Sequence, residues 1–330
     1  MRVESSVTSI SWIPSEAVAG MTKMPFEIGF AHYDPAPPDV IEDLEALRLA
    51  DRFRFANQLS AWIDVDDGRV VGAGYSGKGH IGSTTVSFGV GKATVAAVSL
   101  PDRQPDPEIS ETSARFVQTA GGKTGMPMPR RVKYPPFMQV SAPLAWTTLA
   151  LTIHADGRVE HEVIGASPFP RHWIYDADNK LALKTGTIDF KTWALEAFGG
   201  HSPWGDEDSA ALVTAVETAL ERELSQHIMR GGATPRISTV AKDDILVKQG
   251  DPGSELFLLL DGVLSVEVDG EKLVDLGPGV VLGERALLEG GSRTATLRAV
   301  TKCRVATISG DEIDPSKLAE LAGGHRREDG

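Results

Sequence analysis

The chain has 330 residues, in which 33 Lys and Arg stand against 46 Asp and Glu, so the formal net charge at pH 7 is −13. Such acidity argues against nucleic acid as the main partner, because phosphate backbones are bound through basic patches. The length suits about two domains, and the single cysteine (Cys303), the lack of a secretory signal and the lack of a long apolar run predict a cytoplasmic protein with no membrane partner.

Residues 1–205 are predicted to form an α+β domain that is mainly antiparallel β-sheet. Hydrophobic patterning predicts strands at 7–13 and 26–32, and the run Asp34-Pro35-Ala36-Pro37-Pro38 interrupts regular structure after them. Asp39 is suited to cap a helix that runs to about residue 62. The buried side of this predicted helix consists of Ile41, Leu44, Leu47, Ala50, Phe55 and Leu59.

A series of short β-rich runs follows this helix. Asp66-Asp67-Gly68 predicts a turn, and Asp156-Gly157 predicts a hairpin turn between strands at 148–155 and 158–164. Because strands outnumber helices and the connections are typical of hairpins, we expect a sheet curled around a pocket, with one or two packed helices. The other predicted strands lie at 69–76, 82–89, 93–99, 113–119, 137–141 and 145–154.

Residues 206–232 are predicted to form a helix that links two domains. Acidic residues fill its first turn, Arg230 lies at its end and Gly231-Gly232 stops it, which agrees with the helix dipole and with C-terminal capping. Two roles are open for this helix: a relay between the domains, or a packing helix that forms a dimer seam. Its apolar stripe consists of Leu212, Val213, Val216, Leu220, Leu224 and Ile228.

Residues 233–330 are predicted to form a second domain. Within it, residues 236–308 alternate short β-rich runs with Gly, Pro and Asp turns, which is typical of an antiparallel roll. Two segments of this domain contain the charged residues that suit a ligand. Gly283–Leu287 contains Glu284, and Arg293–Thr296 begins with Arg293. A carboxylate accepts bonds from sugar hydroxyls and an Arg fork donates to phosphate oxygens. Period-two stretches with one face inward are formed by Ile245, Val247, Leu256, Leu258, Leu260, Leu264, Val266, Val268, Leu273 and Leu276.

Residues 234–312 resemble the cyclic nucleotide-binding domain family, and the two polar segments resemble its phosphate-binding cassette. The resemblance extends to the turn Gly250-Asp251-Pro252-Gly253 and to the strand and turn at 255–262, in the order and spacing of the family. It implies a jelly-roll-like β-roll that binds a cyclic nucleotide, with cAMP as the default ligand and cGMP as an open alternative. We expect no other cofactor and no metal.

The resemblance also implies roles for single residues. Glu284 matches the residue that binds the 2′-hydroxyl of the ribose, and Arg293 matches the residue that neutralises the cyclic phosphate. Arg285 stands where the family usually has an aliphatic residue, so its head must reach outward or find a partner. Thr294 can touch the phosphate, and in some members of the family this hydroxyl favours guanine. Positions that close around the ligand are matched by Gly283, Ala286 and Ala295.

Several motifs in the N-terminal part fit a functional pattern only in part. Residues 72–77 fit GxGxxG, but no helix is predicted after them, and Gly122-Lys123-Thr124 lacks the upstream glycine of a P-loop. The hairpin at 154–162 contains His154, Glu160, His161 and Glu162, which suit either a metal site or, as we favour, a solvated hairpin face. The aromatic segment 168–176 suits a small-molecule pocket or a contact between domains.

The chain as a whole resembles actinobacterial two-part proteins whose N-terminal part has no assigned activity. We predict a regulatory protein in which the C-terminal domain binds the nucleotide and passes the signal to the N-terminal domain, and we assign no catalytic residue. The alternatives are an enzyme whose N-terminal small-molecule domain is gated by the nucleotide, and a roll that has lost its ligand and serves as a scaffold. Because one short helix (315–321) follows the roll, we expect no DNA partner, whereas a homodimer or a protein partner stays open.

Overall fold

The computed structural model describes residues 1–14, 18, 23–24, 33–88, 91–124, 128–131, 138–141, 143–168, 170–186, 203, 213–214, 235–288, 291–313, 316 and 318–319. They belong to two compact units, Met1–Val213 and Thr214–Gly330. The predicted linking helix at 206–232 lies outside the described residues except at Val213–Thr214, where the chain forms a two-residue strand, β16. The predicted domain limits at 205 and 233 therefore stay predictions.

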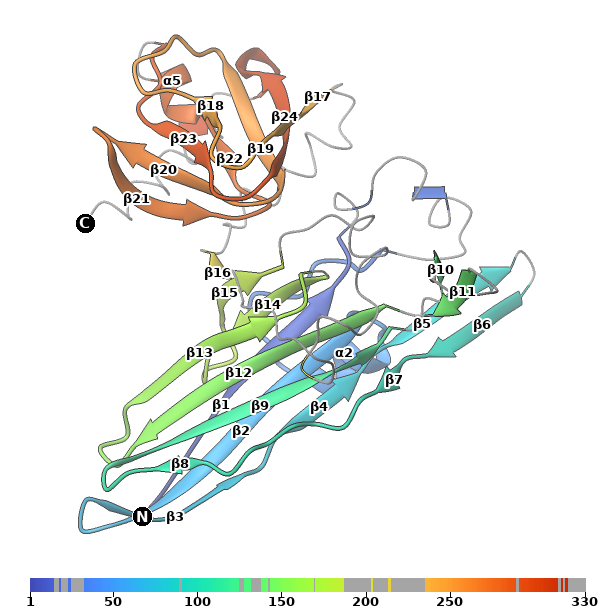
Figure 1. Cartoon of the computed structure of the whole chain (residues 1–330), viewed down its shortest axis with the longest axis vertical. Helices are drawn as coiled ribbons and strands as arrows, with labels where there is room; N and C mark the ends of the chain where they lie inside the picture. The colour runs from blue at the N-terminus through green and yellow to red at the C-terminus, as the bar shows by residue number, and fades with distance from the viewer. Residues whose placement is uncertain are drawn as a thin grey trace. The chain divides into compact units, whose positions relative to one another are not determined.

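The first unit contains two main β-sheets (Figure 1). The strands of the larger sheet are β1 (Arg2–Trp12), β2 (Phe55–Asp66), β3 (Arg69–Tyr75), β4 (Lys78–Ile81), β14 (Arg171–Tyr175), β15 (Leu181–Thr185) and β16. Those of the smaller sheet are β7 (Val98–Ser99), β8 (Glu108–Ile109), β9 (Ser113–Lys123), β12 (Leu144–His154) and β13 (Val159–Ala166). The larger sheet has the order β16-β15-β14-β1-β2-β3, with β4 beside β2, and the smaller has the order β13-β12-β9-β7, with β8 beside β9.

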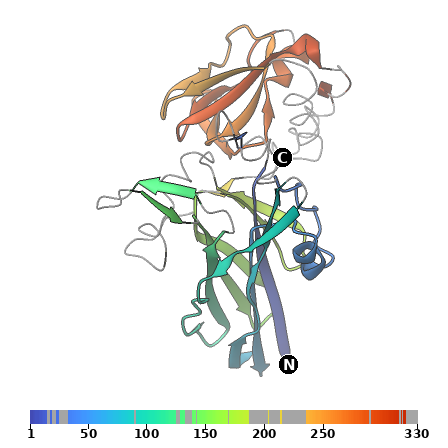
Figure 2. The same ribbon diagram turned by 90° about the vertical axis from the view of Figure 1, so that its right-hand side faces the viewer.

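The two sheets of this unit share one hydrophobic core. Val7 of β1 and Leu59 of β2 belong to the same buried cluster as Phe116 of β9 and Leu149 of β12. The same strands are seen from the side in Figure 2. Neighbouring long strands run antiparallel, as in the pairs β1–β2 and β12–β9, which confirms the predicted antiparallel architecture. Two hairpins, β5 (Ser83–Phe88) with β6 (Gly91–Ala96) and β10 (Met128–Arg131) with β11 (Met138–Ser141), complete the described strands.

The predicted helix from Asp39 to about residue 62 is wrong over most of its length. The observed helix α2 covers only Leu44–Leu49, and Asp43 caps it by accepting bonds from the backbone N–H groups of two residues in its first turn, at 2.9 and 3.0 Å. The helix ends where Asp51 adopts a φ of 52°. From Phe55 onward alternate residues are buried, which is the period of a strand. Phe55 and Leu59 misled the prediction because a spacing of four fits both a helix and a strand.

Most of the other sequence-based elements are confirmed. The predicted strands at 7–13, 69–76, 82–89, 113–119, 137–141 and 145–154 are observed as β1, β3, β5, β9, β11 and β12, and the run 93–99 is divided between β6 and β7. The turns at 66–68 and 156–157 connect β2 to β3 and β12 to β13. The predicted strand at 26–32 lies outside the described residues. None of the helices that the structure describes is long and apolar enough to cross a bilayer.

The second unit is a roll of two four-stranded sheets. One sheet consists of β17 (Arg236–Val240), β24 (Cys303–Ser309), β19 (Glu255–Asp261) and β22 (Val281–Leu282), in that order. The other consists of β18 (Ile245–Val247), β23 (Thr296–Ala299), β20 (Leu264–Val268) and β21 (Glu271–Leu276). Leu259 and Val305 of the first sheet share a buried cluster with Leu264 and Leu297 of the second. The predicted β-roll is therefore confirmed.

The prediction of which residues face the interior of the roll is wrong at two positions. Ile245 and Leu273 are exposed, at 42% and 57%, because they belong to β18 and β21, the two edge strands of their sheet. At the C-terminal end, the three described residues of the predicted helix 315–321 are helical. One of them, Leu318, packs into the cluster that also contains Ile313 and Leu258.

An ion pair is buried in the first unit. Asp34, from the predicted breaker run, accepts bonds from Nη2 and Nε of Arg54 at 2.8 and 3.1 Å, and both side chains are at most 1% exposed. The same carboxylate accepts a bond from the backbone N–H of Ile13 at 2.7 Å. These contacts fasten the segment that begins at residue 33 to β2 and to the end of β1. Because removing one partner leaves a buried charge uncompensated, such pairs are sensitive to single substitutions.

We therefore expect Asp34→Ala to lower the free energy of unfolding of the first unit by about 3–5 kcal/mol. All six tryptophans lie in this unit, so urea unfolding followed by tryptophan fluorescence reports on it alone. The control is Asp64→Ala, which removes the exposed pair between Asp64 and Arg2 and should cost less than about 1 kcal/mol. Equal effects of the two substitutions would contradict this role for the buried pair.

Candidate functional site

The candidate site lies in the second unit, where β22 leads through Gly283 into the short helix α5 (Glu284–Leu288). Gly283 has a φ of 98°, which favours glycine. A Cβ at this position would lie 2.7 Å from Nη1 of Arg293 and 2.8 Å from the carbonyl oxygen of Glu255. The glycine therefore allows the main chain to pass close to the arginine that the sequence singled out.

The backbone of Arg293 is fixed by the turn at 250–253. Its N–H donates to the carbonyl of Asp251, and its own carbonyl accepts from the N–H of Gly250, both at 2.8 Å. Beside it, the N–H of Gly253 donates to the carbonyl of Gly291 at 2.8 Å. The turn that the sequence marked only as a family feature thus holds the arginine segment in place.

The side chain of Arg293 is buried, with 5% of its surface exposed. Its Nη1 donates to the carbonyl oxygen of Glu255 at 2.9 Å, and its Cζ lies 4.8 Å from the centroid of the Phe257 ring. Its Nε is buried and has no hydrogen-bond partner among the residues that the structure describes. A buried donor without an acceptor is costly, and a phosphate oxygen is an acceptor that would satisfy it.

Glu284 and Arg293 belong to one electrostatic site. Burial lowers the pKa of the Arg293 guanidinium below its usual value, and the nearby carboxylates of Glu255 and Glu284 oppose that shift. Glu284 is the first residue of α5 and is itself buried, with 4% of its surface exposed. The site therefore combines a carboxylate, which can accept hydroxyl bonds, with a guanidinium, which can bind an anion.

The remaining predicted site residues surround this pair along the chain. Ala286 is buried in α5, and Arg285 is half-buried on the same helix. Thr294 and Ala295 are half-buried between Arg293 and the start of β23. The loop is closed by the N–H of Gly291, which donates to the carbonyl of Ala286 at 2.7 Å.

Three contributors were given no role in this site by the sequence analysis, although Gly253 was identified there as part of a turn of the family. A Cβ at Gly253 would lie 2.1 Å from Nε of Arg293, so this glycine leaves the space that the guanidinium occupies. Glu255 contributes its main-chain carbonyl, for which a side-chain motif gives no signal. In the sequence, Phe257 cannot be told apart from the other apolar residues of a buried strand. Only the fold shows that its ring faces the arginine.

The GxGxxG-like segment has a structural role. Gly72 and Gly74 lie in β3, and a Cβ at Gly74 would lie 2.7 Å from the indole of Trp62 on the neighbouring strand. The guanidinium of Arg2 lies over the same indole, 3.9 Å from its centroid. The glycines of β3 therefore make room for an aromatic ring. Gly122, from the P-loop-like triplet, lies within β9.

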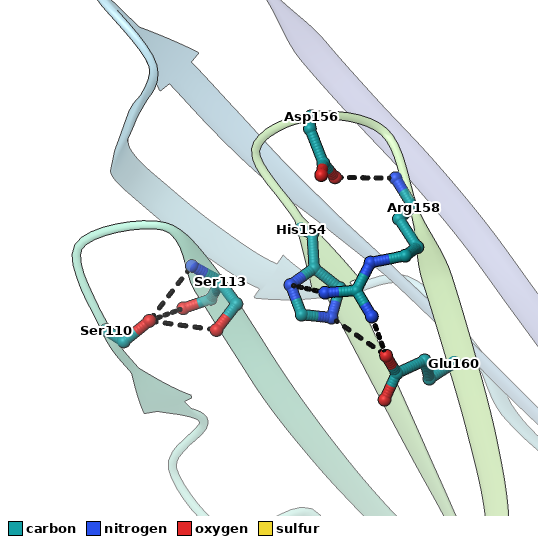
Figure 3. Close-up of polar contacts among 6 residues, drawn as sticks. All are labelled: Ser110, Ser113, His154, Asp156, Arg158 and Glu160. Atoms are coloured by element: carbon teal, nitrogen blue, oxygen red, sulfur yellow. Dashed lines mark hydrogen bonds and ion pairs between the residues drawn. The ribbon is translucent and has the colours of Figure 1, made fainter.

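The hairpin histidines do not converge on a metal site. Figure 3 shows Arg158 between His154 and Glu160, donating to Nδ1 of His154 at 3.3 Å and forming an ion pair with Glu160. His161 lies on the other face of β13, between Val159 and Val163, which both pack into the core. In the described part of the chain, no group of three or more His, Cys, Asp or Glu is placed to hold a metal ion.

The aromatic segment 168–176 forms the core strand β14, and its five strand residues are all buried. Nε2 of His172 faces the carbonyl oxygen of Ser167 at 2.8 Å, so it carries the proton and donates. Nδ1 then accepts from the hydroxyl of Ser11 at 2.7 Å. His172 is 0% and Ser11 1% exposed, so this Ser–His pair lies in the interior. Burial lowers the pKa of His172 from 6.5 to about 4.

Residues 237–315 match the family model of the cyclic nucleotide-binding domain. Curated relatives include the human potassium/sodium hyperpolarization-activated cyclic nucleotide-gated channel 3, which is 32% identical over 132 residues, 40% of this chain and 15% of the channel. The mouse channel 2 is 37% identical over 71 residues, 22% of this chain and 8% of the channel. The chain thus spans less than a sixth of the length of these relatives.

Solved structures similar to the chain include PKAR CBD2 bound to Sp-2Cl-cAMPS, at 25% identity. The match covers 28% of this chain and 63% of that one, with a TM-score of 0.25. A cyclic nucleotide-binding domain from Methylobacillus flagellatus KT is also 25% identical, with the same coverage and a TM-score of 0.26. From the family match, the second unit contains a cyclic nucleotide-binding domain, as the sequence predicted.

The burial of His172 predicts that the stability of the first unit depends on pH. The pKa of His172 is about 4 in the folded chain, below the usual 6.5. Between pH 6.5 and pH 4, the histidine therefore binds a proton in the unfolded chain but not in the folded chain, which favours unfolding. The free energy of unfolding of the first unit should therefore fall by about 3 kcal/mol from this group between pH 6.5 and pH 4. In His172→Gln this part of the slope should vanish.

The measurement is urea unfolding at several pH values, followed by tryptophan fluorescence. The carboxylates contribute to the slope in both proteins, so the difference between parent and variant isolates His172. Parallel slopes in the two proteins would show that the histidine is protonated equally in the folded and unfolded chains.

Proposed function

We propose that the second unit binds a cyclic nucleotide in the site around Arg293 and Glu284. The guanidinium of Arg293 contacts the cyclic phosphate, and the carboxylate of Glu284 accepts a bond from the 2′-hydroxyl of the ribose. The observation that carries the proposal is the buried Nε of Arg293, which has no partner in the described part of the chain and lies inside the segment that matches the family. A phosphate oxygen is an acceptor that would satisfy this donor.

The polar groups of the site support a ligand that carries both a phosphate diester and hydroxyl groups. One buried guanidinium provides one positive charge, and the Glu255 carbonyl already accepts from its Nη1. Glu284 provides acceptors and no donor when ionised, which suits hydroxyl groups. We place cAMP first among the ligands and cGMP second, with Thr294 as the residue whose hydroxyl bears on the choice. The other residues assigned to the site are Gly283, Arg285, Ala286 and Ala295.

We further propose that the chain is a regulatory protein whose first unit receives the signal. This role is supported by the division of the chain: we assign nucleotide binding to the second unit, which leaves the first unit to respond to it. Among the described residues of the first unit, Ser11 and His172 form a candidate acid–base pair, and both are buried. Residues 206–232 connect the two parts of the chain, and they are our candidate for the relay.

Removing the guanidinium should abolish nucleotide binding. We expect calorimetric titration of the parent with cAMP to release heat, Arg293→Ala to release none, and Glu284→Ala to bind more weakly than the parent. Saturation at a hundredfold excess over the Kd should stabilise the parent by about 2.7 kcal/mol, a gain that Arg293→Ala loses. The preferred base follows from a parallel titration with cGMP.

The matched control is Arg298→Ala, which removes another arginine of the roll. Arg298 pairs with Glu267 at 2.8 Å and is 39% exposed, outside the site. It should leave the Kd unchanged. Parent-like binding by Arg293→Ala would show that the site is misassigned, and no heat from the parent with either nucleotide would show that the roll is a scaffold.

The relay predicts a change in the connecting segment. If nucleotide binding alters residues 206–230, their amide hydrogen exchange should differ between the free and the cAMP-saturated chain. The Arg293→Ala variant, treated with the same nucleotide, provides the control and should show no difference. Unchanged exchange in the saturated parent would refute the relay and leave the binding proposal standing.

A further inference from the structure

Phe257 provides an aromatic surface for the guanidinium of Arg293. The Cζ of Arg293 lies 4.8 Å from the ring centroid, within the range of about 6 Å over which a cation is attracted to a ring face. Phe257 is 4% exposed and Arg293 5%, so the contact is removed from water. Removal from water strengthens such an attraction.

The ring is held rigidly relative to both polar residues of the site. Phe257 lies on β19 and pairs with Leu282 of β22 and with Thr307 of β24. Leu282 directly precedes Gly283, and a Cβ at Gly283 would lie 3.5 Å from Cδ2 of the ring. The ring therefore has a fixed place beside the start of α5, where Glu284 stands.

The guanidinium makes few other polar contacts with the described residues. Of its donors, Nη1 bonds to the Glu255 carbonyl, whereas Nε is buried and has no partner within the described ranges. An arginine side chain has several rotatable bonds, and holding it in one geometry costs conformational entropy. A fixed ring face opposes that loss, because it attracts the cation in one orientation and excludes water from one side of it.

We propose that Phe257 is a positioning residue for nucleotide binding, whose ring face holds the Arg293 guanidinium in the orientation that meets the phosphate. This inference rests on the proposed function. An aliphatic side chain would fill the same core space, but it would not attract the cation. The fraction of molecules with the guanidinium in place would then fall, and the apparent Kd would rise by the inverse of that fraction.

The test changes the charge distribution of the ring and keeps its shape. In the full chain, 3,4,5-trifluorophenylalanine replaces Phe257, and cAMP is titrated by calorimetry. Fluorination removes the negative face of the ring, so the Kd should rise by up to about fivefold, which corresponds to about 1 kcal/mol. Phe257→Leu should raise the Kd at least as much. The control is Leu259→Val, which shortens a neighbour in the same buried cluster and should leave the Kd within about twofold of the parent.

Each outcome bears on a different claim. A graded loss of affinity on fluorination, with Leu259→Val binding like the parent, supports the inference. If the fluorinated chain binds cAMP like the parent, Phe257 is only a core residue, and the binding function stands without it. Equal losses in Phe257→Leu and Leu259→Val would also overturn the inference. If the parent binds neither cAMP nor cGMP, the proposed function fails and the inference fails with it.

Discussion

The burial of one guanidinium is the constraint on which the organisation of the second unit depends. An arginine keeps its charge in proteins, so a buried one requires partners and exact space. The turn at 250–253 fixes the backbone of Arg293, and the glycines at 253 and 283 leave room for its side chain. The carbonyl of Glu255 and the ring of Phe257 provide a partial set of partners. In our proposal, the donor that this set leaves over is the one that meets the phosphate.

In the first unit, several buried polar groups have hydrogen-bond partners within the fold. Arg54 has a bidentate carboxylate partner in Asp34, and His172 bonds to Ser11 and Ser167. These groups are satisfied within the fold, so their chemistry stabilises the two-sheet architecture. In the second unit, the unpartnered Nε of Arg293 lies in a segment that matches a nucleotide-binding family. We assign ligand binding to the second unit because this donor lies within the segment that matches the family, and we leave the first unit as the proposed receiver of the signal.

Much of this account was predictable from local sequence, and the failures have physical causes. Alternating hydrophobic residues and Gly or Asp turns predicted most strands. The cassette resemblance selected Glu284 and Arg293, which the fold brings near each other, and their role in binding stays a prediction. The helix at 39–62 failed because Phe55 and Leu59 fit both periodicities, and the prediction of an inward Leu273 failed because its strand lies at a sheet edge. Phe257, Gly253 and the Glu255 carbonyl act through contacts between distant segments, about which short-range patterns carry no information.

The most direct test of the central claim follows the proton NMR signal of the Arg293 Nε–H group, assigned by its loss in Arg293→Lys. If the buried donor awaits a phosphate oxygen, saturation with cAMP should move this proton signal downfield, as a new charge-assisted hydrogen bond requires. The Nε–H signal of Arg298, which already pairs with Glu267, should stay in place. A stationary Arg293 signal at saturating cAMP would contradict the account.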